Sequence, residues 1–144
     1  MPEKSTTTTV ARASAALPAS GAYDTTPTKV DLSPYAQTLT VWATYTRGDT
    51  NGAARIKPEV SPDGVTWYRA TLVDTSTIGG TAPDGVLATR ALAYDLPVPA
   101  GASALLTSHT VDVRGARFFR CAAAEVGAVG TPGTLAMLTS EDAS

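Results

Sequence analysis

The chain has 144 residues, the size of one ordinary domain, which excludes a TIM barrel or a two-domain enzyme of usual size. Eleven Lys and Arg residues against thirteen Asp and Glu residues give a net charge of -2. No overall electrostatic force therefore draws the chain to nucleic acid or to an anionic membrane. Ala and Thr make up 48 residues, whereas Leu, Ile, Val and Phe supply only 27. We expect a folded domain with a thin core that gains stability from neighbouring subunits.

Targeting signals and disulfides are not expected. Cys121 is the one cysteine, so an intrachain disulfide is excluded. The first residues have no apolar run of the kind that a secretory signal needs, and no stretch approaches the ~20 apolar residues that span a bilayer. We expect a soluble protein that is made in a cytoplasm and has no membrane partner.

Residues 1–28 differ in composition from the rest of the chain. Val10 and Leu17 are their only members of the Leu, Ile, Val and Phe set, among many Thr, Ser and Ala residues. Two interpretations are open: a disordered tail, or an extended arm that becomes ordered on another subunit. We predict the arm, with Val10 and Leu17 as candidate interface residues, followed by a domain over residues 29–144.

Strict alternation predicts a strand over residues 38–46. Trp42 falls among threonines on one face of this strand, opposite an apolar face made by Leu39, Val41, Ala43 and Tyr45.

Residues 55–60 also alternate, and Pro58 within them indicates an edge strand or a bulge, because proline has no N–H to donate. Between the two strands, residues 47–52 are rich in turn formers and predict a hairpin connection.

The remaining segments also favour short strands, and helical periods with caps are absent from the sequence. We predict an all-β fold, an antiparallel β-sandwich or jelly roll with an extended N-terminal arm and a long loop over residues 74–85. Further strands are expected at 66–73, 86–96, 105–113, 116–125 and 134–139. The core is expected to contain Leu39, Val41, Ile56, Val60, Leu72, Val111, Val113, Phe119 and Leu135.

The residues needed for catalysis or metal binding are scarce. His109 is the one histidine, and its neighbours Ser108 and Thr110 point to the opposite face of a strand, so neither can pair with it as a nucleophile. We predict a histidine of the core. One His and one Cys cannot form a structural zinc site. We therefore expect no enzyme activity, no metal and no cofactor.

Arg114, Arg117 and Arg120 form a local positive cluster. No aromatic motif typical of an RNA-binding strand accompanies them. We interpret them first as residues of salt bridges or of a protein interface, and second as phosphate contacts; a nucleic-acid partner is not expected.

The most specific local pattern is Ser-Pro-Asp-Gly-Val-Thr-Trp at residues 61–67. It resembles the S-x-D-G-x-T-W hairpin of many β-sandwich modules. In such a turn, Asp63 can accept backbone N–H bonds, Gly64 can take a positive φ, and Trp67 can anchor the hairpin. We predict that this motif has a structural role.

A second pattern follows over residues 111–121, Val-Asp-Val-Arg-Gly-Ala-Arg-Phe-Phe-Arg-Cys, and a Gly-rich hairpin follows over residues 127–135. Together with the first motif, these segments resemble small virion proteins of tailed bacteriophages over residues 38–139. The resemblance implies a non-enzymatic β-sandwich that is built into a phage particle.

This family resemblance implies a capsid decoration or cement protein, located in the virion, that binds the major capsid protein or other virion proteins across coat-subunit joints. A homo-oligomer is expected. Two alternatives stay open. One is a structural component of the neck or tail. The other is a carbohydrate-binding sandwich or adhesin module, for which Trp42 is the candidate aromatic platform.

Overall fold

A computed structural model of the chain describes residues 8–18, 22–50, 52–73, 94–96, 103–126 and 130–142. The regular structure in these ranges consists of strands, and they contain no helix. The strands are β1 (Thr8–Ala16), β2 (Val30–Asp31), β3 (Thr38–Thr46), β4 (Ala53–Ser61), β5 (Tyr68–Arg69), β6 (Thr71–Leu72), β7 (Tyr94–Leu96), β8 (Ala104–Asp112), β9 (Phe118–Val126) and β10 (Thr134–Asp142).

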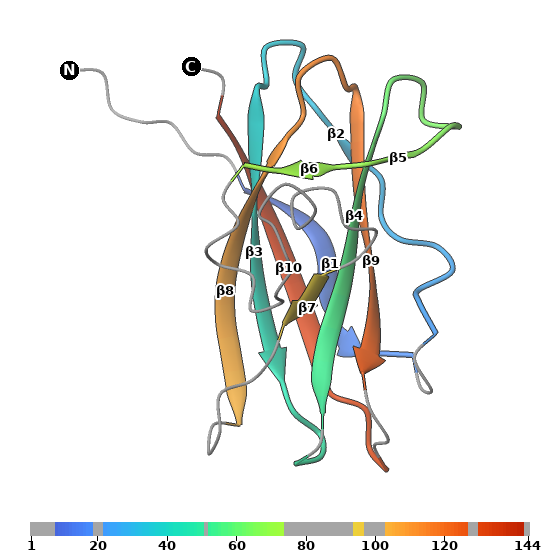
Figure 1. The fold of residues 1–144 in the computed structure, drawn as a ribbon, viewed down its shortest axis with the longest axis vertical. Helices are drawn as coiled ribbons and strands as arrows, with labels where there is room; N and C mark the ends of the chain where they lie inside the picture. Colours follow the sequence, from blue (N-terminus) through green and yellow to red (C-terminus); the bar gives the residue numbers. More distant parts are fainter. Residues whose placement is uncertain are drawn as a thin grey trace, which may run out of the picture.

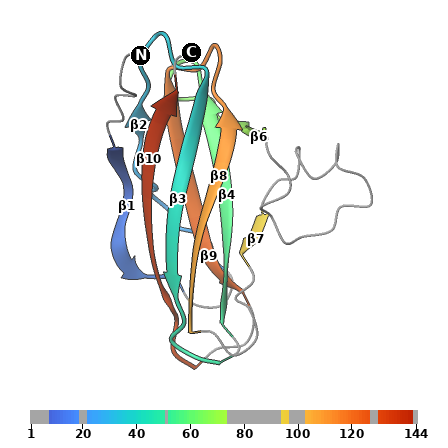
Figure 2. The same cartoon turned by 90° about the vertical axis from the view of Figure 1, so that its left-hand side faces the viewer.

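Two antiparallel sheets pack against each other, which confirms the predicted β-sandwich. Sheet A has the strand order β1-β10-β3-β8-β6, and sheet B has the order β2-β9-β4-β5, with β7 also pairing with β4. In Figure 1, β8 and β3 lie on the left and β4 and β9 on the right. Figure 2 shows β1, β10, β3 and β8 side by side, with β4 and β9 behind them.

The core lies between the two sheets, where the alternation of the sequence predicted it. All four inward residues of β3 are buried, namely Leu39, Val41, Ala43 and Tyr45. Five further residues of the predicted list are buried as well: Ile56, Val111, Val113, Phe119 and Leu135. Val60 is partly buried against this cluster. The side chain of Leu72 lies outside the described residues.

The predicted hairpin at residues 47–52 is wrong. β3 pairs with β8 and β10 in sheet A, whereas β4 pairs with β9, β5 and β7 in sheet B. The connection therefore crosses from one sheet to the other. Gly, Asp and Asn suit any tight change of direction, so these residues cannot distinguish a hairpin from such a crossing.

The prediction that Pro58 marks an edge strand or a bulge is also wrong. β4 lies between β9 and the short strands β5 and β7, and its nine-residue register with β9 is uninterrupted. The carbonyl of Pro58 accepts the N–H of Ala70 at 3.1 Å, so the proline nitrogen faces the same side of β4. On this side, β5 pairs with residues 59–60 and β7 with residues 54–56, so among the described residues no strand pairs with Pro58 where its nitrogen lacks a hydrogen.

The predicted strand over residues 66–73 is divided between the sheets. β5 continues the turn at residues 62–67 and pairs with β4, whereas β6 pairs with β8 in sheet A. Ala70, between them, is buried. Of the predicted strand over residues 86–96, only β7 lies within the described residues, and the predicted loop over residues 74–85 lies outside them.

The N-terminal segment belongs to the domain itself. β1 pairs with β10, and both Ala11 and Leu17 lie in the core cluster. The prediction that residues 1–28 stay outside the domain's own core is therefore wrong for residues 8–18. The backbone N–H of Leu17 also donates to Gly133 at 2.9 Å. Ala11 and Leu17 suffice to hold this segment on the domain, because the backbone hydrogen bonds from β1 to β10 stabilise it as well.

Val10 and Leu17 test this correction as a matched pair. We expect Leu17→Ala to lower the free energy of unfolding by about 2–4 kcal/mol, because it removes a side chain that is 3% exposed. Val10→Ala should change it by less than about 0.5 kcal/mol, because the Val10 side chain is 52% exposed. Urea denaturation measures both. Two equally small effects would mean that residue 17 lies outside the core.

Candidate interaction surfaces

The turn between β4 and β5 has the structural role that its sequence predicted. Asp63 Oδ1 accepts the N–H groups of Val65 at 2.8 Å and Thr66 at 2.9 Å. Ser61 Oγ accepts the N–H of Gly64 at 2.7 Å, and Gly64 has a φ of 80°. The hydrogen bonds from Thr66, Val65 and Ser61 hold the pKa of Asp63 below its usual value, in that order of effect. The Asp63 carboxylate therefore stabilises the turn through its hydrogen bonds to the backbone.

Trp67 supports a guanidinium on the outer face of sheet B. The Arg120 guanidinium carbon lies 4.2 Å from the centre of the Trp67 ring. Arg120 Nε also donates to Glu59 Oε1 at 2.9 Å. Arg120 is thus held between an aromatic ring and a carboxylate, which fixes its position on the sheet.

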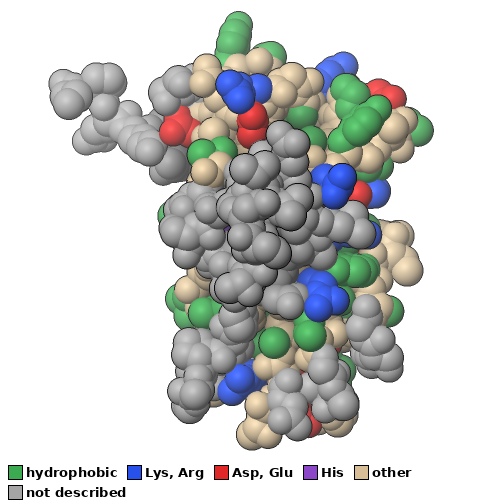
Figure 3. Space-filling view, in the orientation of Figure 1, with side chains coloured by type: hydrophobic (Ala, Val, Ile, Leu, Met, Phe, Trp, Pro, Cys, Tyr) green, Lys and Arg blue, Asp and Glu red, His purple; other side chains and the backbone are tan. Residues whose placement is uncertain are grey.

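Further cations on the same side of the molecule also lie over aromatic rings. Lys29 Nζ lies 4.6 Å from the centre of the Phe118 ring, and Arg117 lies 5.8 Å from the same ring. Lys57 Nζ lies 4.6 Å from the centre of the Tyr23 ring. Figure 3 shows Lys and Arg side chains beside hydrophobic ones on the side of the molecule where β4 and β5 lie. We call this surface the cation–aromatic face; it comprises Tyr23, Lys29, Lys57, Trp67, Arg117, Phe118 and Arg120.

The structure separates the three arginines that the sequence grouped. Arg117 and Arg120 belong to the cation–aromatic face. Arg114 lies in the connection between β8 and β9 and pairs with Asp112, its Nη2 lying 2.7 Å from Asp112 Oδ2. This hydrogen bond lowers the pKa of Asp112. The prediction of salt bridges is confirmed for Arg114 and Arg120.

The outer face of sheet A has a different chemistry. In the middle of this face Trp42 is 49% exposed, and its indole Nε1 donates to Ser140 Oγ at 2.9 Å. The Oγ1 atoms of Thr40 and Thr110 lie 3.1 Å apart on neighbouring strands. We call this surface the uncharged face; it comprises Val10, Thr40, Trp42, Thr44, Leu106, Ser108, Thr110, Ala136, Leu138 and Ser140.

Three apolar residues of the uncharged face lie in one row across the strands. The register places Val10 opposite Leu138, and Leu138 opposite Trp42. Their exposed fractions are 52%, 41% and 49%. Leu106 of β8, which lies opposite Thr44 of β3, is 76% exposed. Among the proposed interface residues of the N-terminal segment, Val10 is therefore at the surface and Leu17 is not.

Two polar side chains are buried between the sheets at the end near residues 47–52. Tyr45 of sheet A donates its hydroxyl to Glu125 of sheet B, with the two carboxylate oxygens at 3.0 and 2.9 Å. The N–H of Gly133 donates to Glu125 Oε1 at 3.1 Å. A Cβ at Gly52 would lie 2.6 Å from the Tyr45 hydroxyl, so this close approach requires glycine. The contact joins the sheets.

Sequence analysis missed Glu125, although the inward alternation of Phe119, Cys121 and Ala123 could have placed it on the buried face. His109 is 1% exposed, which confirms the predicted core histidine, and its Nε2 lies 3.3 Å from Thr107 Oγ1.

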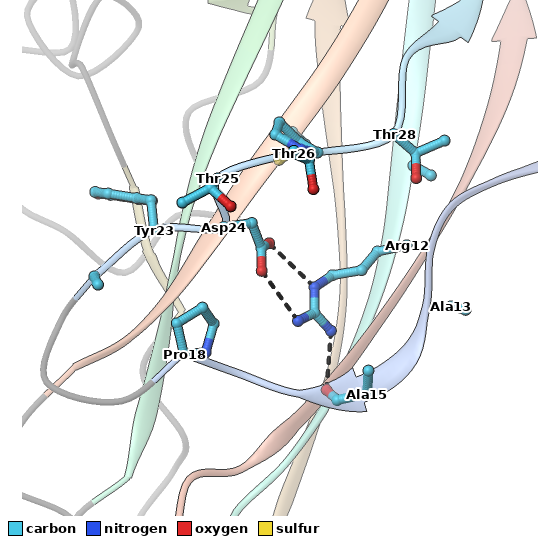
Figure 4. Close-up of a pocket in the computed structure, with 13 residues that line it drawn as sticks. Arg12, Ala13, Ala15, Pro18, Tyr23, Asp24, Thr25, Thr26 and Thr28 are labelled. Atoms are coloured by element: carbon cyan, nitrogen blue, oxygen red, sulfur yellow. Dashed lines mark hydrogen bonds and ion pairs between the residues drawn. The ribbon is translucent and has the colours of Figure 1, made fainter.

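A cavity of about 460 Å³ lies between β1 and residues 22–28 (Figure 4). Arg12 crosses it, with its Nε and Nη2 contacting Asp24 at 3.3 Å and its other donors bonded to backbone carbonyls such as Leu135 at 2.6 Å. Burial raises the pKa of Cys121, at the cavity wall, to about 12, so its thiol stays protonated. These groups have a structural role, because the ion pair between Arg12 and Asp24 holds residues 22–28 against β1.

Neither a cluster of metal ligands nor a membrane-spanning helix occurs in the described ranges. They contain no group of three or more His, Cys, Asp or Glu side chains that could hold a metal ion. Within the same ranges, no helix is long and apolar enough to cross a membrane.

No protein-family model matches the chain, and neither curated proteins nor solved structures give a match. The resemblance to phage virion proteins therefore stays a prediction from the motifs at residues 61–67 and 111–121.

We expect Tyr45→Phe to lower the free energy of unfolding by about 1–3 kcal/mol at pH 7, because it leaves the buried Glu125 carboxylate with one fewer partner. Tyr68→Phe is the control, since Tyr68 is exposed. Urea denaturation measures both variants. A Tyr45→Phe protein as stable as the parent would show that the contact contributes nothing to stability.

The same contact predicts a loss of stability in alkali. Burial, and next the hydrogen bond with Glu125, raise the pKa of Tyr45 above the value of ~10 that it has in the unfolded chain. Above pH ~10 the folded state therefore holds more protons than the unfolded state, and the free energy of unfolding falls as pH rises. Below that pH the contribution is fully present. The difference in stability between the parent and Tyr45→Phe should shrink above pH ~10; a constant difference would contradict the assignment.

Proposed function

We propose that this protein is a non-enzymatic structural component of a phage particle, and specifically a capsid decoration protein that binds coat subunits through its cation–aromatic face. The proposal rests on the resemblance of residues 61–67 and 111–121 to phage virion proteins. The observation that carries the mode of binding is the set of cations held over aromatic rings on one side of the sandwich.

Cations that are already held in place suit binding to carboxylates on a neighbouring protein. Arg120 is fixed by Trp67 and Glu59, so less side-chain entropy is lost when a partner binds. Lys29 and Arg117 are both exposed and both lie near the ring of Phe118, so they are the candidates for direct contact. Phe118 supplies apolar area beside them. Charge and apolar area together match the composition of protein interfaces, in which aromatic residues and arginine are enriched.

Each exposed ion pair contributes only about 0.2–1 kcal/mol, so one copy binds weakly. A particle offers many equivalent joints, and a subunit that contacts two coat subunits at once gains effective concentration. Binding should therefore depend on the geometry of the assembled capsid and be weak for a free coat subunit.

A carbohydrate-binding module is the second candidate function. The half-exposed Trp42 ring, with Thr40, Thr44 and Ser108 around it, is the observation that favours it. Sugars stack on aromatic rings and bond to neighbouring hydroxyl groups.

Addition of the purified protein to capsids that lack it tests the first proposal. We expect saturable uptake that raises the resistance of the capsids to heat and weakens as salt increases, because salt screens exposed charges. Arg117→Glu should reduce the affinity about tenfold or more by reversing a charge on the cation–aromatic face. Arg114→Glu is the matched control, since Arg114 lies outside that face.

No uptake by capsids would contradict the proposal, as would uptake that Arg117→Glu and Arg114→Glu change equally. An array of bacterial glycans tests the second candidate in parallel. Glycan binding that is lost in Trp42→Ala, without capsid uptake, would favour the carbohydrate-binding function.

A further inference from the structure

We propose that the uncharged face of sheet A binds the same face of a second copy of this chain, giving a two-fold symmetric dimer centred on the row of Val10, Leu138 and Trp42. This contact uses the sheet opposite to the cation–aromatic face. It is therefore independent of the proposed attachment to coat subunits.

The charge distribution specifies the kind of partner. Over the middle of the uncharged face, the outward residues of β3, β8 and β10 are Thr, Ser, Ala, Leu and Trp. Acidic side chains occur at one end only, where Asp112 and Asp142 lie on either side of Thr38. A charged partner would lose solvation here without gaining an ion pair. The fitting partner is itself uncharged with an apolar centre, and this chain's own face meets both conditions.

The regularity of the strands specifies a flat partner. β3 pairs with β8 and with β10 over nine residues each, without a shift in register. Such a surface suits a second sheet that packs on it face to face, at about 10 Å and with strands within about 30° of parallel. Two pairs of its polar groups bond to each other, Thr40 to Thr110 and the Trp42 indole to Ser140.

The hydrogen bond that the Trp42 indole already makes favours a protein partner over a sugar. Its N–H already donates to Ser140, so the ring offers apolar surface rather than a free polar group. On the same row it has Leu138 next to it and Val10 beyond. Three apolar side chains in line make a hydrophobic strip, whereas a sugar site combines one ring with several free polar groups.

Symmetry determines the orientation. A two-fold axis between the faces, perpendicular to the strands and along the row, places Trp42 opposite its own copy. The same axis puts the two ends that carry Asp112 and Asp142 at opposite ends of the dimer, so the acidic groups do not meet. An axis parallel to the strands would bring these ends together and would not place all three residues of the row opposite their own copies.

The area suits a weak dimer. Strands β1, β10, β3 and β8 are about 4.8 Å apart, and nine residues extend about 30 Å, so the footprint is about 570 Å² per copy and about 1,100 Å² for the pair. This lies just below the range of stable specific interfaces, about 1,200–2,000 Å². We therefore expect a dimer in the micromolar range or weaker.

Sedimentation equilibrium of the full chain, from about 1 µM to about 1 mM, measures the association. We expect a reversible dimer that Trp42→Lys weakens at least 100-fold, because the symmetry brings two ammonium groups together. Val65→Lys is the matched control: Val65 is 81% exposed and lies in the turn between β4 and β5, away from sheet A. Circular dichroism and thermal melting verify that both variants fold.

A single Leu138→Cys substitution gives a second test, since the row meets its own copy. We expect a short bis-maleimide reagent, which can span the ~10 Å between packed sheets, to produce a covalent dimer, whereas Val65→Cys should stay monomeric under the same treatment; the native Cys121 is buried in both. A chain that stays monomeric at about 1 mM would overturn the proposal. So would a dimer that Trp42→Lys leaves intact, or a monomer that binds glycans through Trp42. None of these results bears on capsid uptake, which is tested through Arg117.

Discussion

The register of β3 within sheet A is the constraint on which the rest of the structure depends. Side chains alternate along a strand, so a shift of one residue would exchange every inward and outward side chain. In the observed register Tyr45 points inward and reaches Glu125 of the other sheet, while Trp42 points outward. The cost of leaving the buried Glu125 carboxylate without Tyr45 therefore adds to the cost of exposing the apolar residues of β3.

Because a sandwich buries one face of each sheet, its two outer faces remain for contact with other molecules. They differ in chemistry. Sheet B and its flanks hold Lys29, Lys57 and Arg120 over aromatic rings. The outer face of sheet A has hydroxyl groups around Trp42 and Leu138. One small domain with two unlike faces suits assembly with two unlike partners, and this is the property that connects the proposed attachment to coat subunits with the proposed dimer.

Local sequence pattern predicted what depends on a single segment: alternation predicted the buried and exposed residues of Thr38–Thr46, and the motif at residues 61–67 predicted its turn. It could not predict what depends on which strands pair. The residues at 47–52 suit a crossing between sheets as well as a hairpin, and Pro58 is tolerated because the short strands β5 and β7 pair with other residues of β4. Leu17 was assigned to an interface because composition describes how many apolar residues a segment has, not where each one lies.

Hydroxyl-radical footprinting of the dilute protein, with peptide-level mass spectrometry, tests this register most directly. Trp42 of β3 and Met137 of β10 are both readily oxidised, but Trp42 is 49% exposed and Met137 is fully buried. The structure predicts rapid oxidation of Trp42 and protection of Met137 in the folded chain, with both reactive after unfolding. Oxidation of Met137 as fast as Trp42 in the folded chain would mean that the two outer faces are not those described, and the account of both would fail.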